Sequence, residues 1–532
     1  MEPLTTGATS SFPSADAAAR SNAMRDGSFT QTQFVPIAMV IFAVAFILRA
    51  FHLDYLSLWN DEIFSRYYYD LFGPEFLLTT GMTIEPTPPL YYFVLQGWMG
   101  LFGHSAIALR SLSVLASLIV LPLVYAIARE VSTRNVALVA AALFAVSPMS
   151  IFFAQEARVY TMTAIPASLM LLGIARCLRT GRVADLVLYG AGAVFAMYSH
   201  ATLTFMVAAC NIVVIAYLLL APSRERRLAP RDWILTNIAV ALFAVPLAFS
   251  MLSNVSHNAG GLNWIPPLSM RDVIVHLTAL VSGMITPPRF PGVELTVLLL
   301  LVLGIAIAMS KMPRRTLAVL VAIPLMYFAL VVMVSLKQTI LLPRVLCWVT
   351  VPLCAALAYA VTAPSRARLA ARVMLVLTFG AGLYYQLAFA DGAKSAYRQV
   401  FAQARPGLLQ ADEVVITPYT SPLPLMYYAP GADHFRKWRD PRVGGIEPVQ
   451  IPERLGIPAI DVRQVSADIK SGKSVWLVAD SPDSKFLPQL LTIAPPPERS
   501  YESMCHDLAQ GVDQPSSCIV VYGWNVDRQS MK

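Results

Sequence analysis

Long apolar stretches recur along most of this 532-residue chain, and they constrain its fold more than any other feature. Each is roughly 17 to 23 residues long, enough for a helix to cross about 30 Å of hydrocarbon. The stretches predict an all-α polytopic membrane domain over residues 34–390, with about eleven spans at residues 34–51, 111–128, 136–153, 160–176, 184–200, 202–221, 234–252, 293–310, 317–336, 346–362 and 373–390.

The composition agrees with a membrane protein. Hydrophobic residues make up 56% of the chain and charged residues only 14%, whereas about a quarter of the residues in soluble proteins are charged. The net charge of +8 does not indicate nucleic-acid binding, because the basic residues lie between apolar segments and form no run or single face. We interpret the basic excess as a signal of membrane topology.

One apolar segment, residues 88–102, is short and begins with two prolines, so it is either a span or a helix lying at the membrane interface. Counting it as a span inverts every later loop. Leaving it out puts fifteen basic residues on one side, which the positive-inside rule assigns to the cytoplasm: Arg129, Arg134, Arg176, Arg179, Arg182, Arg224, Arg226, Arg227, Arg231, Lys311, Arg314, Arg315, Arg366, Arg368 and Arg372. We therefore predict an interfacial helix there.

This topology places loop 52–110 and everything after residue 390 outside the cytoplasm. Residues 1–33 are polar and lack an apolar signal segment, so they are expected to form a disordered cytoplasmic tail. Residues 391–532 are predicted to form a small extracytoplasmic α/β domain with strands at 413–417, 474–479 and 518–522. Cys505 and Cys518 in this domain are a disulfide candidate, left open here.

Acidic residues cluster in loop 52–110, and Asp61 and Glu62 lead this cluster. On a helix, two adjacent side chains diverge by about 100°, so only one of these carboxylates would face a reacting atom. The other would orient the loop or cap a helix. A purely structural alternative is that the pair forms the acidic first turn of an interfacial helix.

Other polar residues on the same side interrupt or border the spans. Glu156 and Arg158 lie in a turn between two apolar segments, where they are a functional candidate or neutralise one another. His200 and Arg344 either mark the membrane boundary or contact substrate, and Arg344 suits bidentate phosphate recognition. Tyr91 follows the double proline and could serve only as an aromatic interface anchor.

The order of these motifs resembles the GT-C superfamily of lipid-phosphate-dependent glycosyltransferases, in particular bacterial relatives of the protein O-mannosyltransferases and of the lipid A aminoarabinose transferase. The resemblance rests on Asp61-Glu62 after the first span, Thr87-Pro88-Pro89-Leu90 and the Gln-Glu-Ala-Arg turn at 155–158, with looser matches at 198–200 and 343–345. Thr87 stands where the family often has a basic residue, and Val345 where it usually has Tyr.

The resemblance implies an integral-membrane enzyme that moves a sugar from a polyprenyl-phosphate donor to an extracytoplasmic hydroxyl, with inversion. It implies Asp61 as base, with Glu62 and Glu156 as further catalytic candidates. The implied substrate-binding residues are Glu85, Tyr91, Arg158, His200 and Arg344. Some relatives use a divalent metal ion and others need none, so the sequence leaves the cofactor open.

Two other hypotheses for the function are compatible with the sequence. A transporter or flippase for a lipid-linked or anionic substrate would use Glu156, Arg158 and the acidic loop as a polar pathway, but it should carry more charged or broken positions within its spans. A sensor or assembly protein would work through its C-terminal domain. The predicted partners are membrane lipid, the lipid-linked sugar and an acceptor that is a protein, lipid A, another glycolipid or a cell-wall glycan. The predicted location is the bacterial plasma membrane.

Overall fold

The computed structural model describes most of the chain. The described residues are 31–79, 87–256, 265–284, 312–362, 368–388, 394, 396–417, 420–438, 450–479, 486–507 and 512–526, with scattered positions between 296 and 310. The predicted disordered tail lies almost entirely outside them, and α2 begins at Gln31. Of the predicted spans, 293–310 also falls mainly outside the described residues.

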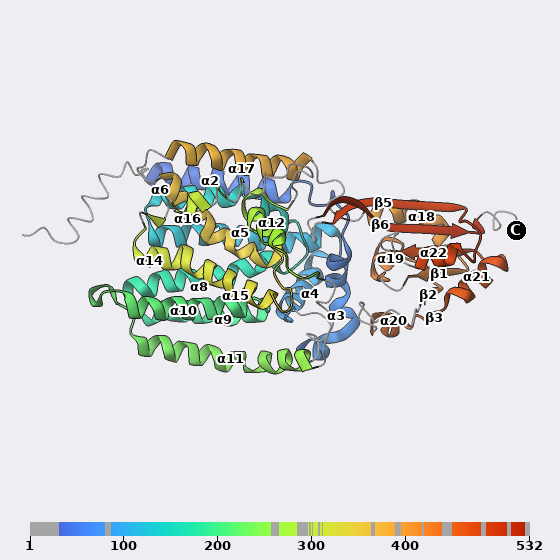
Figure 1. Ribbon diagram of the computed structural model, residues 1–532, viewed down its shortest axis with the longest axis horizontal. Coiled ribbons are helices and arrows are strands. Elements are labelled where there is room, and N and C mark those ends of the chain that lie inside the picture. Colours follow the sequence, from blue (N-terminus) through green and yellow to red (C-terminus); the bar gives the residue numbers. More distant parts are fainter. Residues whose placement is uncertain are drawn as a thin grey trace, which may run out of the picture.

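A helical bundle and a smaller domain with a β-sheet make up the molecule (Figure 1). The helices of the bundle and its extramembrane segments are α2 (Gln31–Ala50), α3 (Asn60–Thr79), α4 (Leu90–Phe102), α5 (Ala106–Val131), α6 (Arg134–Ala145), α7 (Pro148–Ala154), α8 (Tyr160–Thr180), α9 (Val183–Ser199), α10 (Leu203–Leu220), η2 (Ser223–Glu225), α11 (Pro230–Ser256), α12 (Met270–Ser282), α14 (Arg314–Leu317), η3 (Ala318–Ala322), α15 (Ile323–Ser335), η4 (Pro343–Val349), α16 (Thr350–Thr362) and α17 (Arg368–Ala388).

Most of the predicted spans correspond to helices. Among the described residues, seven helical segments are long and apolar enough to cross a membrane, and each coincides with a predicted span. The helices α9 and α17 coincide with two more. The segment predicted as a span at 136–153 forms the two helices α6 and α7, which meet at a bend of 54°. The chain is therefore a multi-pass membrane protein, and this segment is bent in the described part of it.

Pro148 explains the break, since it has no N–H to bond the carbonyl of Phe144 and so cannot continue α6. The side chain of Arg49, at the end of α2, takes over. Its guanidinium donates to the carbonyl oxygens of Phe144 at 2.9 Å and Ala145 at 2.8 Å, and to the hydroxyls of Ser117 at 2.7 Å and Ser150 at 2.8 Å. Arg49 is completely buried. A cation from another helix thus satisfies the exposed end of α6.

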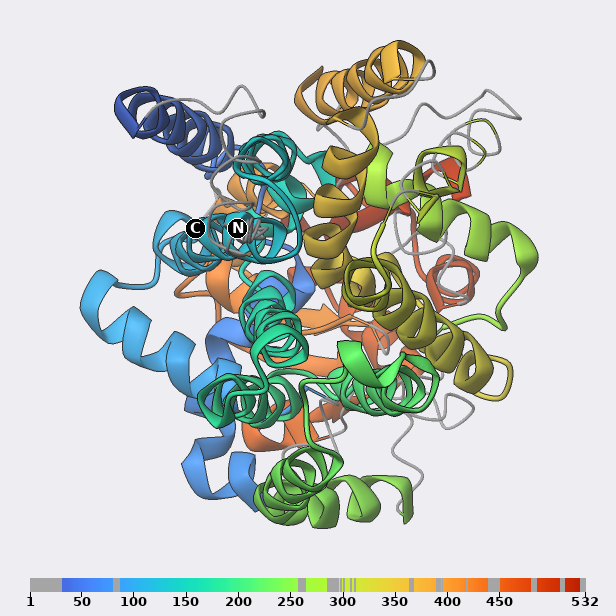
Figure 2. The same ribbon diagram turned by 90° about the vertical axis from the view of Figure 1, so that its left-hand side faces the viewer.

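The segment 88–102 forms α4, a helix of 13 residues that ends at Gly103 with φ +83°. At 1.5 Å per residue such a helix is too short to cross about 30 Å of hydrocarbon. Figure 2, which looks along the bundle, shows α3 and α4 from the side while most bundle helices are seen end-on. The prediction that this segment is not a span is confirmed.

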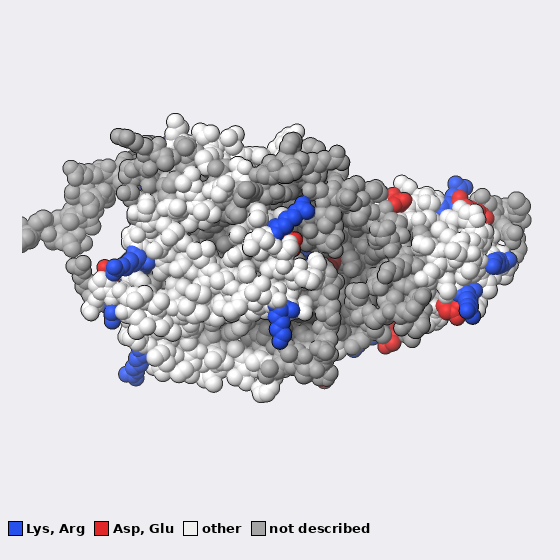
Figure 3. All heavy atoms as spheres, in the orientation of Figure 1, with Lys and Arg blue, Asp and Glu red and all other residues white. Residues whose placement is uncertain are grey.

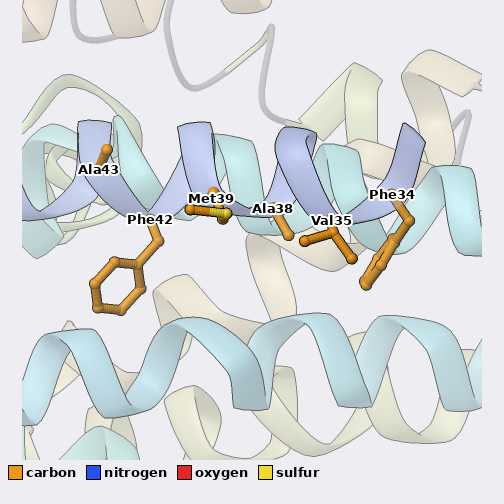
Figure 4. Close-up of a pocket in the computed structure, with 6 residues that line it drawn as sticks. All are labelled: Phe34, Val35, Ala38, Met39, Phe42 and Ala43. Atoms are coloured by element: carbon orange, nitrogen blue, oxygen red, sulfur yellow. The ribbon is translucent and has the colours of Figure 1, made fainter. Parts of the chain in front are cut away.

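Helix α2 stands at the edge of the bundle and leaves most of its surface exposed (Figure 2). Phe34, Val35 and Phe42 point from α2 toward the neighbouring helix and line an apolar pocket (Figure 4). The adjoining pocket is lined by residues of α5 and α6 as well, among them Leu121 and Leu138. Such an apolar, exposed helix face is expected for a segment that borders lipid.

The C-terminal domain contains a mixed six-stranded sheet in the order β3-β2-β1-β4-β6-β5. Strands β1, β2, β3 and β4 run parallel, and β6 is antiparallel to both β4 and β5. The elements are α18 (Tyr397–Leu408), β1 (Glu413–Ile416), α19 (Leu423–Tyr428), β2 (Phe435–Trp438), α20 (Gln450–Arg454), β3 (Ala459–Ile460), α21 (Val462–Lys470), β4 (Val475–Ala479), α22 (Phe486–Leu491), β5 (Arg499–Asp507) and β6 (Val512–Trp524).

The predicted α/β domain is confirmed, and its three predicted strands appear in β1, β4 and β6. The strands β1 and β4 are buried along their whole length, as expected for continuous apolar runs in a parallel sheet. Strands β2, β3 and β5 were not predicted, because they are short or polar. The side chains of Cys505 and Cys518 lie outside the described residues, so their pairing stays a prediction.

Four of the basic connections that were predicted to lie on one side gather at one end of the bundle. The connections at 129–134, 176–182, 224–231 and 312–315 lie at the end remote from the sheet, while α3, α4 and the 198–202 turn lie at the end that faces it (Figure 1). Figure 3 shows basic side chains at the remote end. The common sidedness predicted from the basic residues therefore corresponds to one physical end of the bundle.

Replacing Arg49 tests its role at the break. We expect Arg49→Leu to lower the free energy of unfolding by roughly 2 to 4 kcal/mol, because two buried carbonyls and two hydroxyls each lose one charged donor. Thermal unfolding in detergent micelles measures the change. Arg129→Leu is the matched control, since Arg129 is exposed and should shift stability by less than about 0.5 kcal/mol. Equal stability of the Arg49 variant and the control would contradict the assignment.

Candidate active site

A buried ion pair joins α3 to α5 at the start of the first loop. The Nε and Nη2 atoms of Arg110 each donate to one carboxylate oxygen of Glu62, both at 2.8 Å. Neither residue is more than 2% exposed. The backbone N–H of Ala157 also donates to Glu62, at 2.8 Å. Both oxygens of Glu62 are thus occupied, and the carboxylate ties α3 to α5 and to the turn before α8.

Arg110 also holds the chain that leads into α3. Its remaining N–H groups donate to the carbonyl oxygens of Leu53 at 2.8 Å, Leu56 at 2.8 Å and Ser57 at 2.9 Å. These carbonyls lie in an irregular segment with no helix or strand to pair them. One guanidinium therefore satisfies both the buried carboxylate and the backbone beside it, as a planar fork of donors can.

Lys394 adds a second buried cation to this group. Its Nζ lies 3.2 Å from an oxygen of Glu62 and 3.2 Å from an oxygen of Glu156. Glu156 is 4% exposed. We call Glu62, Arg110, Glu156 and Lys394 the buried charge cluster. It contains two anions and two cations, so its charges balance.

The two carboxyls of the cluster differ in acidity. Burial alone would raise the pKa of Glu62, but the charges of Arg110 and Lys394 and the hydrogen bonds from Arg110 and Ala157 outweigh it and lower the pKa to about 2. Burial and the nearby charge of Glu62 raise the pKa of Glu156, against the opposing effect of Lys394. Glu62 is therefore firmly ionised and a weak base.

Asp61 lies beside this cluster but projects differently. Its side chain is 30% exposed, and its Oδ2 lies 3.2 Å from Nη1 of Arg344, which follows Pro343 in η4. The same Nη1 donates to the hydroxyl of Tyr160 at 3.1 Å. Adjacent positions on α3 thus place one carboxylate in the protein interior and the next at an accessible surface, as helix geometry requires.

Arg158, in the turn before α8, hydrogen-bonds to the same region. Its Nη1 donates to Ser65 Oγ at 3.0 Å and to the carbonyl oxygen of Asp61 at 3.3 Å. The guanidinium carbons of Arg158 and Arg344 lie 5.7 and 5.6 Å from the ring centre of Tyr160, within cation–π range. Two cations and one carboxylate therefore surround a single aromatic ring.

His200 ends α9 next to this ring, with the ring centres of His200 and Tyr160 6.1 Å apart. Its Nδ1 lies 2.8 Å from the hydroxyl of Thr202 and accepts from the N–H of Thr202 at 3.3 Å. Burial, and then the positive charges of Arg344 and Arg158, lower the pKa of His200 to about 3. His200 is thus neutral at ordinary pH and acts as a hydrogen-bonding group, not as a cation.

Tyr91 on α4 is fully buried, and its hydroxyl has no hydrogen-bond partner among the residues that the structure describes. Burial raises the pKa of this phenol; the charge of Arg158 opposes the shift, and the nearby acids Glu62 and Glu156 add to it. A buried hydroxyl without a partner requires an explanation, and a bound substrate is one. Glu85, the remaining predicted contact, lies outside the described residues.

The structure brings Asp61, Arg158, His200 and Arg344 together at the sheet-facing end of the bundle, although they come from four separate segments. Sequence reasoning missed Arg110, Lys394 and Tyr160. Arg110 could have been noticed as a charge at the start of an apolar span, and Tyr160 stood within the quoted turn motif. Lys394 carries no local signal, because its partners are 332 and 238 residues away (394 − 62 and 394 − 156).

The described residues contain no group of three or more His, Cys, Asp or Glu side chains placed to hold a metal ion. Lys394 and Arg110 occupy the oxygens of Glu62 that a divalent cation would need.

The chain resembles known proteins in part of its sequence and in its fold. Residues 86–249 match the model of the dolichyl-phosphate-mannose-protein mannosyltransferase family, a segment that includes Tyr91, Glu156, Arg158 and His200. The fold is similar to that of ArnT from Cupriavidus metallidurans bound to undecaprenyl phosphate, with a TM-score of 0.58 and 15% identity over 93% of this chain and 98% of that one. This chain has a GT-C glycosyltransferase fold.

Another protein with the GT-C fold, the archaeal oligosaccharyltransferase AglB from Archaeoglobus fulgidus in complex with an inhibitory peptide and a dolichol-phosphate, is similar with a TM-score of 0.51. The identity is 12%, over 85% of this chain and 70% of AglB. No curated protein matches the sequence significantly. The resemblance predicted from the order of motifs is confirmed, and at these identities the solved structures establish the fold alone.

The lowered pKa of Glu62 predicts a pH-dependent stability. Because the pKa falls from an ordinary 4.5 to about 2, ionised Glu62 contributes about 3 kcal/mol above pH 4.5, and this is lost as the pH falls toward 2. We expect Glu62→Gln to be less stable by about this amount at pH 7. In thermal unfolding measurements, the difference in the free energy of unfolding between wild type and Glu62→Gln should decrease between pH 4.5 and 2. A difference that stays constant over this range would contradict the ion-pair assignment.

Proposed function

We propose that this protein is an integral-membrane glycosyltransferase that moves a sugar from a polyprenyl-phosphate donor to an acceptor hydroxyl outside the cytoplasm. The family match over residues 86–249 and the GT-C fold support glycosyl transfer. A lipid-phosphate donor is supported by the undecaprenyl phosphate bound to ArnT and the dolichol-phosphate bound to AglB. The positive-inside rule supports an extracytoplasmic site in a bacterial plasma membrane.

The observation that carries this proposal is the half-exposed carboxylate of Asp61 beside Arg344 and Tyr160. Of the three acidic candidates, Asp61 alone has a substantially exposed side chain, whereas Glu62 and Glu156 are buried and engaged by cations. We assign Asp61 as the base that accepts the proton of the acceptor hydroxyl. Glu62 and Glu156 are then positioning residues and not direct participants.

Arg344 is the proposed phosphate ligand. The guanidinium carries a planar fork of donors that matches a phosphate, and one of its nitrogens pairs with Asp61. A donor phosphate would compete for Arg344 and so release Asp61 as an acceptor for a proton. Arrival of the donor and activation of the base would thus be linked through one ion pair.

In the proposed reaction, the acceptor oxygen attacks C1 of the sugar while the bond from C1 to the phosphate oxygen breaks. The hydroxyl proton passes to Asp61, and the lipid phosphate leaves with its negative charge. Arg344, with Arg158 nearby, stabilises that charge. A single displacement of this kind inverts the anomeric centre. Neutral His200, Tyr91 and Glu85 are proposed substrate contacts.

The acceptor remains open among a protein, lipid A, another glycolipid and a cell-wall glycan. The direct test is transfer of radiolabelled sugar from polyprenyl phosphate by membranes with and without the protein. Label transfer that depends on the protein supports the proposal. Absence of transfer from every such donor would favour the transporter or flippase reading instead.

Asp61→Asn keeps the size of the side chain and removes its basicity. We expect transfer to fall at least about 100-fold, since general base catalysis contributes 10²- to 10⁴-fold. The rate of label transfer by purified protein is the measurement. Asp70→Asn on the same helix is the control, because Asp70 is exposed and contacts Arg66 on α3 and Gln96 on α4, away from Arg344. Near-normal activity of Asp61→Asn would refute the assignment.

Arg344→Ala removes the proposed phosphate ligand. We expect weaker use of the donor, with kcat/KM reduced by about 10- to 150-fold, because a hydrogen bond to a charged group contributes about 1.5 to 3 kcal/mol. Initial rates across a range of donor concentrations measure this. The control is Lys337→Ala, an exposed cation just upstream of the same segment. Unchanged donor dependence in Arg344→Ala would remove its phosphate role.

A further inference from the structure

Residues of the C-terminal segment form hydrogen bonds and an ion pair with the stretch of chain that leads into Asp61. The Nη2 of Arg398 lies 2.7 Å from Oδ1 of Asp54, and the backbone N–H of Arg398 donates to Ser57 Oγ at 3.1 Å. The hydroxyl of Tyr428 accepts from the N–H of Leu58 at 2.6 Å. Residues 54–58 are thus bound directly by α18 and α19 of the C-terminal domain.

The membrane domain also binds this stretch, through hydrogen bonds from Arg110. Arg110 of α5 donates to the carbonyl oxygens of Leu53, Leu56 and Ser57. Segment 53–58 has no helix or strand to hold it, so its shape depends on these two sets of contacts. The conformation just before Asp61 therefore depends on the C-terminal domain as well as on the bundle.

Lys394 is buried against residues of the membrane domain. It lies between the end of α17 at Ala388 and the start of α18 at Tyr397, and its side chain is 5% exposed. There it bridges Glu62, the neighbour of Asp61, and Glu156, which lies two residues before Arg158. One lysine thus joins the segment that carries the proposed base, Asp61, to the segment that carries Arg158.

The charge balance of the buried cluster depends on this lysine. Glu62 and Glu156 provide two negative charges, and Arg110 contacts only the first of them. Without Lys394, the cluster would hold two carboxylates and one cation away from water. Uncompensated buried charge is strongly unfavourable, so the carboxylates would separate, draw in water or take up a proton.

We propose that Lys394 is a positioning residue, through which the C-terminal segment sets the geometry of the proposed active site. This inference rests on the proposed function. Separation of Glu62 from Glu156 displaces the start of α3 relative to the turn at 155–159. The hydrogen bond from the N–H of Ala157 to Glu62 and those from Arg158 to Ser65 and to the carbonyl of Asp61 span that same gap, so they lengthen or break as it widens. Asp61 then no longer faces Arg344 and Tyr160 in a fixed position.

A compensating pair of substitutions tests the proposal. Lys394→Met keeps the length of the side chain and removes its charge; we expect kcat to fall about 100-fold while KM for the donor changes little, as for a misplaced base. Adding Glu156→Gln restores the charge balance. The double variant should regain at least about tenfold in kcat over Lys394→Met, a coupling in the range measured for contacting residues.

Two further variants test whether the effect comes from the charge of Lys394. Lys394→Arg keeps the charge and should retain more activity than Lys394→Met. Lys470→Met is the matched control, because Lys470 is exposed at the end of α21, and it should behave as wild type. The proposal is overturned if Lys394→Met is as active as the control, or if the double variant is no better than Lys394→Met.

Limited proteolysis separates this proposal from the proposed function, because it requires no activity. Arg66 lies on α3, directly after the segment that Lys394 holds. Tryptic cleavage after Arg66 should be faster in Lys394→Met than in wild type and slower again in the double variant. This pattern in a protein that transfers no sugar would support the coupling and refute the function. Identical cleavage in all variants would overturn the coupling, whether or not sugar is transferred.

Discussion

The buried ion pair between Glu62 and Arg110 is the interaction on which the rest of the site depends. A carboxylate and a guanidinium removed from water are costly unless each finds several partners, and here each does. Glu62 accepts from α5, from the turn before α8 and from Lys394, while Arg110 donates to three carbonyls as well. The requirement that every buried donor and acceptor be satisfied is what brings distant segments to one point.

This arrangement divides the work between two adjacent acids. Glu62 has a lowered pKa, is buried and holds the surrounding segments together. The contacts of Glu62 also fix the backbone of Asp61, one residue earlier, whose carboxylate stays accessible. A flexible loop could not hold a proposed base within hydrogen-bond reach of a reacting hydroxyl for long. The positively charged neighbours Arg158 and Arg344 both lie over the ring of Tyr160, which fixes the positions of the cations around Asp61 relative to one another.

The sequence was informative where the physics is local or one-dimensional. Hydrophobic length predicted the spans, the basic residues predicted the sidedness of the loops, and helical geometry predicted that Asp61 and Glu62 diverge. It was uninformative where groups far apart in the chain pair with each other. The turn at 155–158 suggested that Glu156 and Arg158 could neutralise one another, yet the ion pair of Glu156 is with Lys394. The bend at Pro148 was also missed, because Arg49 compensates for it from another helix.

The position of Lys394 has a consequence for how the protein is made. All the described spans precede this residue in the chain, so it emerges from the ribosome after the bundle helices have been synthesised. Until the segment after α17 has been synthesised, Glu62 and Glu156 lack their shared counter-ion. A bundle that lacks this segment therefore leaves its two buried carboxylates with one cation fewer, and the charge cluster is completed only after every described bundle helix has been made.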